Sequence, residues 1–314
     1  MGFFSKPKKT DGWLAFALHG DGISAAHVQR AAGGKPQVRL AQFFSTDKRP
    51  LAEVLEKIGK ELHANSVNCS TLLGGREYNL MSVEAPAVDA SEMRTAVRWR
   101  LKDMLDFPVD KATIDILDIP VDKAMQARGS TIFAVAANNK TIEERQHLFG
   151  DAAIHMRVID IPEMAQRNIS ALLEPDGRGL AMLSFNADGG LLTVTYKGEL
   201  YLSRRIDVAM ELLADPDLER RHAQFDKITL ELQRSLDHFD RQFNFINVSK
   251  LVLTPSGAVG LDEYLSSNLY TPVDTMDLAT VLDFTQVPEL ADVATQQRFF
   301  MTLGAALRQE GASA

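Results

Sequence analysis

The chain has 314 residues, of which 45% are hydrophobic and 24% charged, a composition typical of a folded globular protein rather than a disordered, collagen-like or disulfide-rich one. Its 34 basic and 42 acidic residues give a formal net charge of -8, which argues against a nucleic-acid partner. Cys69, the one cysteine, permits neither an internal disulfide nor a cysteine-rich metal site and so favours a reducing cytoplasm. Single cores stop growing at about 250–300 residues, so we expect two lobes or a duplicated unit.

The first ten residues are basic and aromatic. Phe3 and Phe4 precede Lys6, Lys8 and Lys9, without the apolar core or the small-residue cleavage site of a signal peptide. Elsewhere the longest apolar stretches have the length of strands, so we expect no transmembrane helix. Two interpretations of residues 1–10 stay open: a contact with an anionic membrane surface, or a frayed terminus.

A three-stranded antiparallel unit opens the first half of the chain. Strands are expected at Trp13–Leu18, Ile23–Val28 and Val38–Phe44. The Asp21-Gly22 pair between the first two strands is a strong hairpin signal. A helix follows at 50–63, where apolar residues recur at helix spacing.

Residues 85–154 do not fit this pattern and are interpreted as an inserted subdomain. Its first helix is expected to start near Asp89, which is spaced from Glu92 as in a capping box, and to end near Asp106-Phe107-Pro108. The elements expected after it are strands at Thr113–Ile119 and Thr131–Ala137, a helix at 141–150 and a strand at Ile154–Ile159.

The second half repeats the order of the first. Strands are expected at Gly179–Phe185, Leu191–Tyr196, Glu199–Ile206 and Lys250–Thr254, and helices at Leu218–Ile246 and Val293–Arg308. The order β-β-β-α-β-α, given twice, predicts a duplicated α/β protein with a mixed sheet in each lobe.

Two glycine turns occupy equivalent places in the two halves, and a third small-residue loop follows the late strand of the second half. Backbone N–H groups of two facing turns can bind a phosphate chain, although either turn alone is more simply a tight hairpin. Glycine is expected at Gly22 and Gly189 because those positions would need a positive φ. The candidate nucleotide-binding residues are Gly20, Asp21, Gly22, Asn186, Asp188, Gly189, Gly190, Ser256 and Gly257.

Two other charged groups have competing interpretations. Asp160 and Glu163 suggest paired catalytic carboxylates, but their spacing around Pro162 is better explained as a capping box for a helix at 161–173. The pair Arg204-Arg205 either reaches phosphates or is a solvated strand end. The seven histidines show no zinc-ligand spacing, and neither a P-loop nor a Gly-x-Ser-x-Gly elbow is present, so we assign no metal and no catalytic residue.

Trp99 lies outside the apolar stripe of its predicted helix. It therefore either packs against a second surface of its own domain or anchors a partner. Tryptophan and arginine are enriched at interface hot spots, so Arg98, Trp99 and Lys102 are candidate partner-binding residues.

Several segments carry a resemblance to known proteins. Duplicated halves with glycine turns resemble the actin-like ATPase superfold. Residues Ala96–Pro108, Asp115–Pro120, Asp160–Glu163 and Leu303–Arg308 resemble the PilM family of type IV pilus assembly proteins, most closely its MSHA branch, MshI. The resemblance covers essentially residues 1–310. It implies a duplicated actin-like, ribonuclease H-like two-lobe α/β fold with an FtsA/PilM-type inserted α/β subdomain. The expected parts are the N-terminal segment 1–10, a first lobe of 11–84, 155–178 and 293–309, the insertion 85–154, a second lobe of 179–292 and a tail 310–314.

The resemblance also implies a function. Family members are cytoplasmic, lie at the inner face of the inner membrane, and dock the N-terminal tail of a PilN-like membrane protein, which leads on to PilO-like and PilP-like platform components. Membrane association is then peripheral, through the partner. Self-association is left open.

The departures from the family pattern concern the metal. Actin-like ATPases carry an aspartate before each phosphate hairpin to organise Mg²⁺, whereas this chain has Leu18-His19-Gly20 and Ser184-Phe185-Asn186 there. Without the metal, phosphoryl transfer loses a stabilisation worth several kcal/mol, so we expect hydrolysis to be weak or absent. ATP stays a candidate ligand, with Mg²⁺ only alongside it. The alternatives are an active actin-like ATPase or phosphotransferase, and an interaction module without nucleotide.

Overall fold

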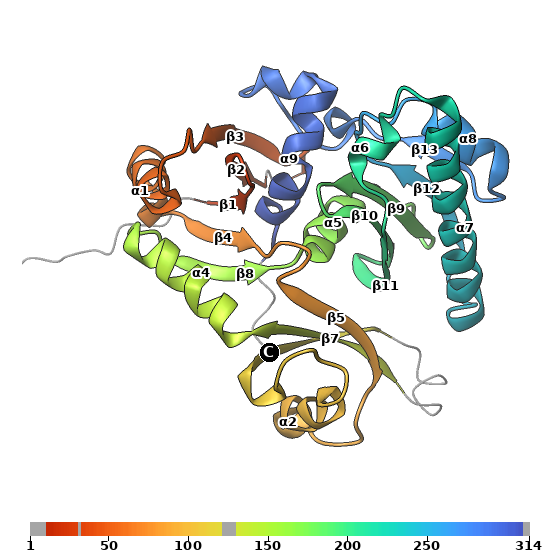
Figure 1. Cartoon of the computed structure of the whole chain (residues 1–314), viewed down its shortest axis with the longest axis horizontal. Coiled ribbons are helices and arrows are strands. Elements are labelled where there is room, and N and C mark those ends of the chain that lie inside the picture. The colour runs from red at the N-terminus through yellow and green to blue at the C-terminus, as the bar shows by residue number, and fades with distance from the viewer. Residues whose placement is uncertain (1–10, 31–32, 121–129, 310–314) are drawn as a thin grey trace, which may run out of the picture.

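The computed structural model describes residues 11–30, 33–120 and 130–309; the N-terminal segment 1–10 and the tail 310–314 lie outside the described residues. Two five-stranded sheets and one three-stranded sheet form the framework. Figure 1 shows the two larger sheets beside each other, with helices α5 (Pro162–Ser170) and α9 (Val293–Ala306) between them, and the small sheet at the bottom of the view. The predicted duplication is therefore present as two lobes.

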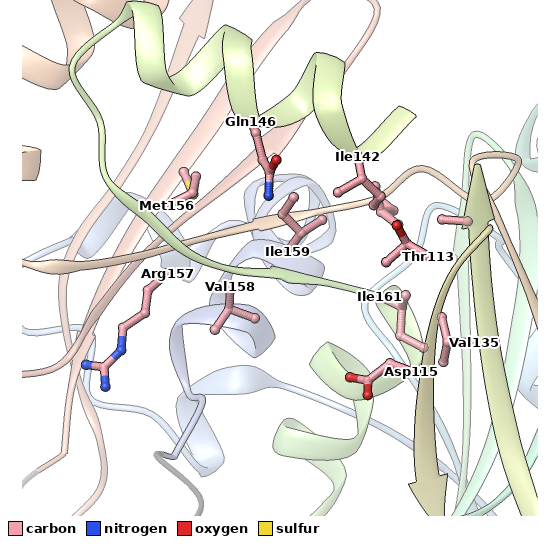
Figure 2. Close-up of a pocket in the computed structure, with 12 residues that line it drawn as sticks. Thr113, Asp115, Val135, Ile142, Gln146, Met156, Arg157, Val158, Ile159 and Ile161 are labelled. Atoms are coloured by element: carbon pink, nitrogen blue, oxygen red, sulfur yellow. The ribbon is translucent and has the colours of Figure 1, made fainter. Parts of the chain in front are cut away.

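The first lobe has the strand order β3-β2-β1-β4-β8. Its strands are β1 (Trp13–Leu18), β2 (Gly22–Gln29), β3 (Gln37–Ser45), β4 (Asn68–Leu72) and β8 (Met156–Asp160). The first three are antiparallel, and β4 and β8 run parallel to β1. Helices α1 (Leu51–Glu61) and α4 (Asn139–Asp151) cover one face, and Figure 2 shows the chain leaving α4 and returning beneath it as β8. The short helix η1 (Ala64–Ser66) leads into β4.

Strand β1 shows how its sequence decides which helix covers which face. Successive side chains of a strand point to opposite faces. Leu14 and Phe16 pack with α1 and α4, and the Phe16 ring lies 5.6 Å from that of Phe149. Ala15 and Ala17 point the other way, into the core shared with α9. The small alanines allow α9 to approach the sheet closely.

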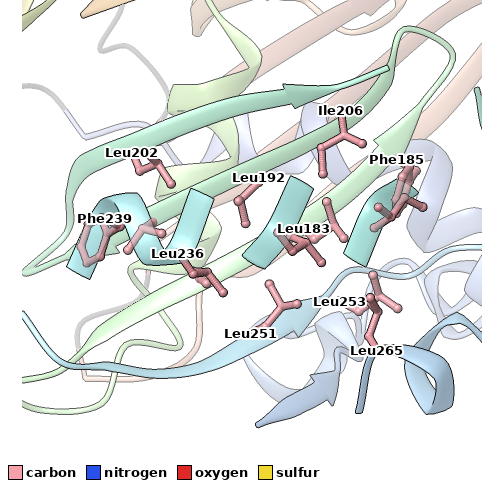
Figure 3. Close-up of a cluster of buried hydrophobic side chains, with 14 of the residues drawn as sticks. Leu183, Phe185, Leu192, Leu202, Ile206, Leu236, Phe239, Leu251, Leu253 and Leu265 are labelled. Atoms are coloured by element: carbon pink, nitrogen blue, oxygen red, sulfur yellow. The ribbon is translucent and has the colours of Figure 1, made fainter. Parts of the chain in front are cut away.

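The second lobe repeats the arrangement with the order β11-β10-β9-β12-β13. Its strands are β9 (Gly179–Asn186), β10 (Gly189–Tyr196), β11 (Glu199–Ile206), β12 (Val248–Leu253) and β13 (Val273–Thr275). Its helices are α6 (Met210–Leu213), α7 (Leu218–Gln242), α8 (Leu261–Asn268), η3 (Leu278–Thr280) and η4 (Pro288–Ala291). Figure 3 shows Leu236 and Phe239 of α7 against Leu192 and Leu202 of the sheet. Helix α7 ends at Gln242, four residues before the expected end.

The inserted subdomain is a three-stranded antiparallel sheet of order β5-β7-β6. It consists of β5 (Tyr78–Glu84), β6 (Ala112–Asp118), β7 (Thr131–Asn138), helix α2 (Ala90–Leu101) and η2 (Val109–Lys111). Strand β5 precedes the boundary expected at 85, and α4, which lies inside the range expected for the insertion, packs in the first lobe instead. Strand β8 pairs with β4 in the first lobe, where residues 155–178 were expected. Asp89 is the N-cap of α2 but its side chain makes no capping bond, so the capping box with Glu92 is wrong.

Helices α5 and α9 cross between the lobes in close contact. A Cβ on Gly304 would lie 2.3 Å from the carbonyl oxygen of Ala165, so only glycine fits at this crossing. Asn168 donates a 2.9 Å hydrogen bond to the Gly304 carbonyl. Gln166 of α5 donates to the Met182 carbonyl and to the Thr193 hydroxyl of the second sheet. The lobes are thus joined through one buried helix pair.

Candidate functional site: an inter-lobe cleft and a strand-edge groove

A cavity of about 940 Å³ lies between the lobes. Its walls are the β1–β2 turn of the first lobe, the β9–β10 turn of the second, the loop 73–77 between β4 and β5, and one face of α9. The volume suits a ligand of nucleotide size, because small-molecule sites commonly measure about 300–1,000 Å³. The cavity therefore lies where the two predicted glycine turns face each other.

The predicted nucleotide-binding residues fall into two groups. Those that line the cavity are Gly20, Asp21, Asn186 and Asp188, and those that do not are Gly22, Gly189, Gly190, Ser256 and Gly257. In the third loop it is Thr254 and Pro255 that face the cavity. A side-chain carbon built on Gly257 would lie 3.6 Å from the Met210 methyl group, so α6 lies against this part of the loop.

The two glycines expected to need a positive φ differ. Gly189 has φ +115°, which confirms the expectation there. The expectation is wrong for Gly22, which is paired in regular β structure with Ser45. A Cβ on Gly22 would lie 2.3 Å from the Phe44 carbonyl oxygen and 2.6 Å from the Phe43 ring. Glycine is needed at Gly22 because of packing, not because of backbone conformation.

Each carboxylate at the cavity wall already has a partner. Asp21 lies 3.4 Å from Arg298, whose guanidinium covers the Phe43 ring at 4.2 Å. Glu77 accepts two bonds from Arg145, at 2.7 and 2.8 Å. The third carboxylate, Asp188, accepts the N–H of a residue in loop 73–77 at 2.9 Å.

The charged side chains at the cavity wall are paired with one another. Arg145 binds Glu77, Arg298 binds Asp21, and Asp188 accepts a backbone N–H, so none of the three carboxylates is unengaged for a metal ion. No cluster of three histidine, cysteine or acidic side chains that could hold a metal occurs in the part of the chain that the structure describes. His19, at the end of β1, has its pKa lowered mainly by burial of its ring, and its Nε2 lies 2.9 Å from the Ser24 hydroxyl. The residues present do not fit Mg²⁺.

Asp160 and Glu163 serve neither of the roles considered from sequence. Ile161, not Asp160, is the N-cap of α5, and Glu163 is fully buried instead of reaching back to the cap, so the capping-box interpretation is wrong. Glu163 accepts a hydrogen bond from the Tyr78 hydroxyl and lies 3.5 Å from Arg205. Asp160 binds Arg308, and burial raises its pKa although Arg308 opposes the shift. Neither carboxylate lines the cleft.

Sequence reasoning missed the loop 73–77. Arg145 is buried and donates to the Leu72 carbonyl at 2.6 Å as well as to Glu77, which fixes this loop in the cleft. The signal that could have found it is Gly74-Gly75 directly after a buried strand, since a glycine pair there indicates a close backbone approach.

A second cavity, of about 280 Å³, lies between the subdomain and the first lobe. It runs between β8 and β6, each at the edge of its sheet, with α4 along one side (Figure 2). Among the described residues no backbone hydrogen bond joins β8 to β6. The groove is lined by Leu73, Thr113, Asp115, Val135, Ala137, Ile142, Gln146, Met156, Arg157, Val158, Ile159 and Ile161.

Comparisons with known proteins identify the fold. Neither a family model nor a curated protein matches the sequence. Among solved structures, a chain of a "PilM-PilN type IV pilus biogenesis complex" superimposes with a TM-score of 0.71 at 17% identity, over 94% of this chain and 98% of that one. The chain has the PilM fold. The predicted two-lobe, actin-like α/β architecture is thereby confirmed.

Two further structures have lower scores. The cytoplasmic domain of EpsL, an inner-membrane component of the type II secretion system of Vibrio cholerae, gives a TM-score of 0.43 at 15% identity, over 66% of this chain and 76% of that one. A Bacteroides thetaiotaomicron protein described as having an actin-like ATPase fold gives 0.47 at 12% identity, over 93% and 99%.

On this PilM fold the three predicted partner-binding residues lie on α2 and its C-terminal end. Trp99 is 69% exposed, so the alternative that it packs against its own domain is wrong. Lys102 is also exposed, while Arg98 is half-buried and donates to the Val109 carbonyl at 2.8 Å. Val97 and Leu101 face the sheet. None of the described helices combines the length and the apolar content needed to cross a bilayer.

Proposed function

We propose that this protein is a cytoplasmic scaffold of type IV pilus assembly, of the MSHA type, which docks the N-terminal tail of a PilN-like inner-membrane protein. The groove between β8 and β6 carries the proposal. The likeness over nearly the whole of both chains to a protein solved as a PilM-PilN complex supports it. The partner would hold the protein at the inner face of the inner membrane, near further components of the pilus platform. The proposal includes no claim about self-association.

The groove has the properties that an extended peptide requires. Two sheet edges border it, and an unpaired edge offers backbone N–H and C=O groups to an added strand. Its wall is largely apolar, with half-buried Val135, Ile142 and Val158, which can take alternate side chains of such a strand. Asp115 provides a charge at the rim. Arg157 lines the groove as well, so its charge offsets that of Asp115, and a short apolar tail matches this surface.

Trp99 defines a second candidate docking surface on the same subdomain. It lies on α2, outside the set of groove-lining residues. Arg94 of α2 nevertheless pairs with the groove residue Asp115 at 3.0 Å, so the two surfaces are in contact through one ion pair. A tail longer than the groove can use both, with Arg98 and Lys102 beside the tryptophan.

Calorimetric titration of the full chain with a PilN-like N-terminal peptide tests the docking. Ile142→Lys places a charge in the groove and should weaken binding at least tenfold. Leu230→Lys is the matched control, since Leu230 is an exposed leucine on α7 of the other lobe. Trp99→Ala should lower the affinity by about 2 kcal/mol, the scale of an interface hot spot. Equal affinity in a folded Ile142→Lys variant would reject the groove, and equal affinity for Trp99→Ala would reject the α2 surface.

A second candidate function is ATP binding without turnover, favoured by the 940 Å³ cleft between the two turns. Backbone N–H groups of the turns at Gly20–Asp21 and Asn186–Asp188 would contact the phosphates, with Arg145 and Arg298 as the cations at the cavity wall. Binding of labelled ATP with and without Mg²⁺, followed by a turnover assay, separates this from an active ATPase and from an interaction module that binds no nucleotide. We expect binding that does not depend on Mg²⁺ and turnover at background.

A further inference from the structure

Gly75 is held from both sides by the opposite lobe. Its N–H donates to the Asp188 carboxylate at 2.9 Å, and its carbonyl accepts a hydrogen bond from Arg205. Asp188 belongs to the β9–β10 turn and Arg205 to β11, both in the second lobe, whereas Gly75 follows β4 of the first. A Cβ on Gly75 would lie 2.6 Å from an Arg205 nitrogen, so a side chain at this position would displace the guanidinium.

Both halves of the contact are fixed by other groups. On the first-lobe side, Glu77 accepts the Gly74 N–H at 2.6 Å and is itself held by buried Arg145. On the second-lobe side, Arg205 lies 3.5 Å from buried Glu163 and its guanidinium covers the Tyr78 ring at 4.8 Å. The groups are therefore positioned before any ligand arrives.

The chemistry of the contact is that of anion recognition. A backbone N–H is a donor that binds phosphate oxygens as readily as carboxylates. Here the anion is the Asp188 carboxylate of the chain itself, which lies at the wall of the cavity where the two turns face each other.

We propose that Asp188 is an internal competitor of phosphate-bearing ligands, and that its contact with Gly75, together with Arg205, latches the two lobes. An oligophosphate gains the Gly75 N–H only when the carboxylate withdraws. The proposal rests on the second candidate function, phosphate binding in the cleft, and is independent of tail docking.

The test compares wild type, Asp188→Ala, Asp188→Asn and Asp21→Ala by calorimetric titration with metal-free tripolyphosphate. Asp21→Ala removes the same charge from the same cavity and frees Arg298, but leaves the latch intact, so only a gain in affinity larger than that of Asp21→Ala is assigned to the latch. Asp188→Ala should bind about five- to tenfold more tightly than wild type, the scale of one charge-assisted hydrogen bond. Asp188→Asn keeps an acceptor but loses the charge, so its affinity for tripolyphosphate should lie between those of wild type and Asp188→Ala. The gain in affinity for Asp21→Ala should be smaller than for either Asp188 variant.

Peptide-resolved hydrogen exchange gives a readout of the latch that needs no ligand. The segment containing Gly75 should exchange faster in Asp188→Ala than in wild type and Asp21→Ala. Unchanged exchange there, or equal tightening in Asp188→Ala and Asp21→Ala, overturns the latch. If no variant binds tripolyphosphate, the competitor and the nucleotide function both fail, while the docking scaffold stands on its own titration.

Discussion

The two hairpin turns have equivalent positions in the duplicated halves but different partners. Asp21 of the first turn pairs with Arg298 of α9, a helix packed on the same sheet. Asp188 of the second turn instead binds Gly75 across the cleft. The first turn thus stays within its lobe and the second joins the lobes. Duplication fixes where a turn lies, and the segment that each turn faces decides what its side chains do.

The largest expected effect is a difference in stability between alanine variants of two glycines at the first turn. Gly22→Ala should destabilise the protein by about 3 kcal/mol, because the new methyl group meets the Phe44 carbonyl, which cannot move without disturbing the sheet. Gly20→Ala is the control, since nothing lies within 4 Å of a Cβ there, and should stay within about 0.5 kcal/mol of wild type. Urea denaturation measures both, and similar midpoints for the two variants would contradict the packing argument.

In the second turn the loss of stability comes mainly from backbone conformation. Gly189→Ala should lower the free energy of unfolding by about 2 kcal/mol, because alanine is strained at φ +115° and its Cβ would also lie 2.8 Å from the Ile206 carbonyl. The same denaturation assay checks this value. A Gly189→Ala variant as stable as Gly20→Ala would mean that the second turn relaxes freely.

The two arginines give a matched pair, since each covers an aromatic ring and faces a carboxylate. Arg205→Ala should cost about 1–2 kcal/mol, because buried Glu163 loses its cation and Gly75 loses its donor. Arg298→Ala breaks a pair with an exposed carboxylate and the contact with the Phe43 ring, and should cost less than about 1 kcal/mol because the guanidinium is half-exposed. Thermal unfolding of both variants tests the ranking, and a larger loss for Arg298→Ala would reverse the comparison.

The smallest effect is a pH dependence of the first turn, where His19 holds the place that Phe185 holds in the second. Burial lowers the pKa of His19, so the unfolded chain takes up a proton at a higher pH than the folded one. Stability should therefore fall as the pH drops through about 6.5, the ordinary histidine value, toward the lowered pKa. His19→Gln should flatten part of this slope in denaturation curves at pH 7 and 5.5; an unchanged slope would assign it to other groups such as His27, whose pKa burial also lowers.

Most of the fold could be predicted from local sequence patterns. Alternating strands, glycine turns and helical spacing are encoded by residues close together, and the three-stranded openings of both lobes agree with the structure. Residues 64–84 gave no such pattern, so β5 and the loop 73–77 were not predicted. Strand β5 mixes polar and apolar residues on a sheet that is buried on only part of its surface.

The candidate site depended on pairs that periodicity cannot reveal. Gly75 and Arg205 are 130 positions apart, and Asp21 and Arg298 are 277 apart. Glu163 looked like a cap because its nearest sequence neighbours suggest one, but the partners that bury it come from β5 and β11. Trp99 was located correctly as lying off the apolar stripe, since a helix face is a local property.

The return of α9 to the first lobe has a consequence for biosynthesis. Strands β1 and β2 are made early, yet the face that carries Ala15 and Ala26 is covered by Phe299 and Leu303, which emerge from the ribosome only after the whole second lobe. Chains fold from the N-terminus during synthesis, and bare apolar sheet surface in that interval is prone to aggregate. The first lobe can therefore complete its core only after the second lobe and α9 have been synthesised, which leaves this face of its sheet uncovered throughout the synthesis of the second lobe.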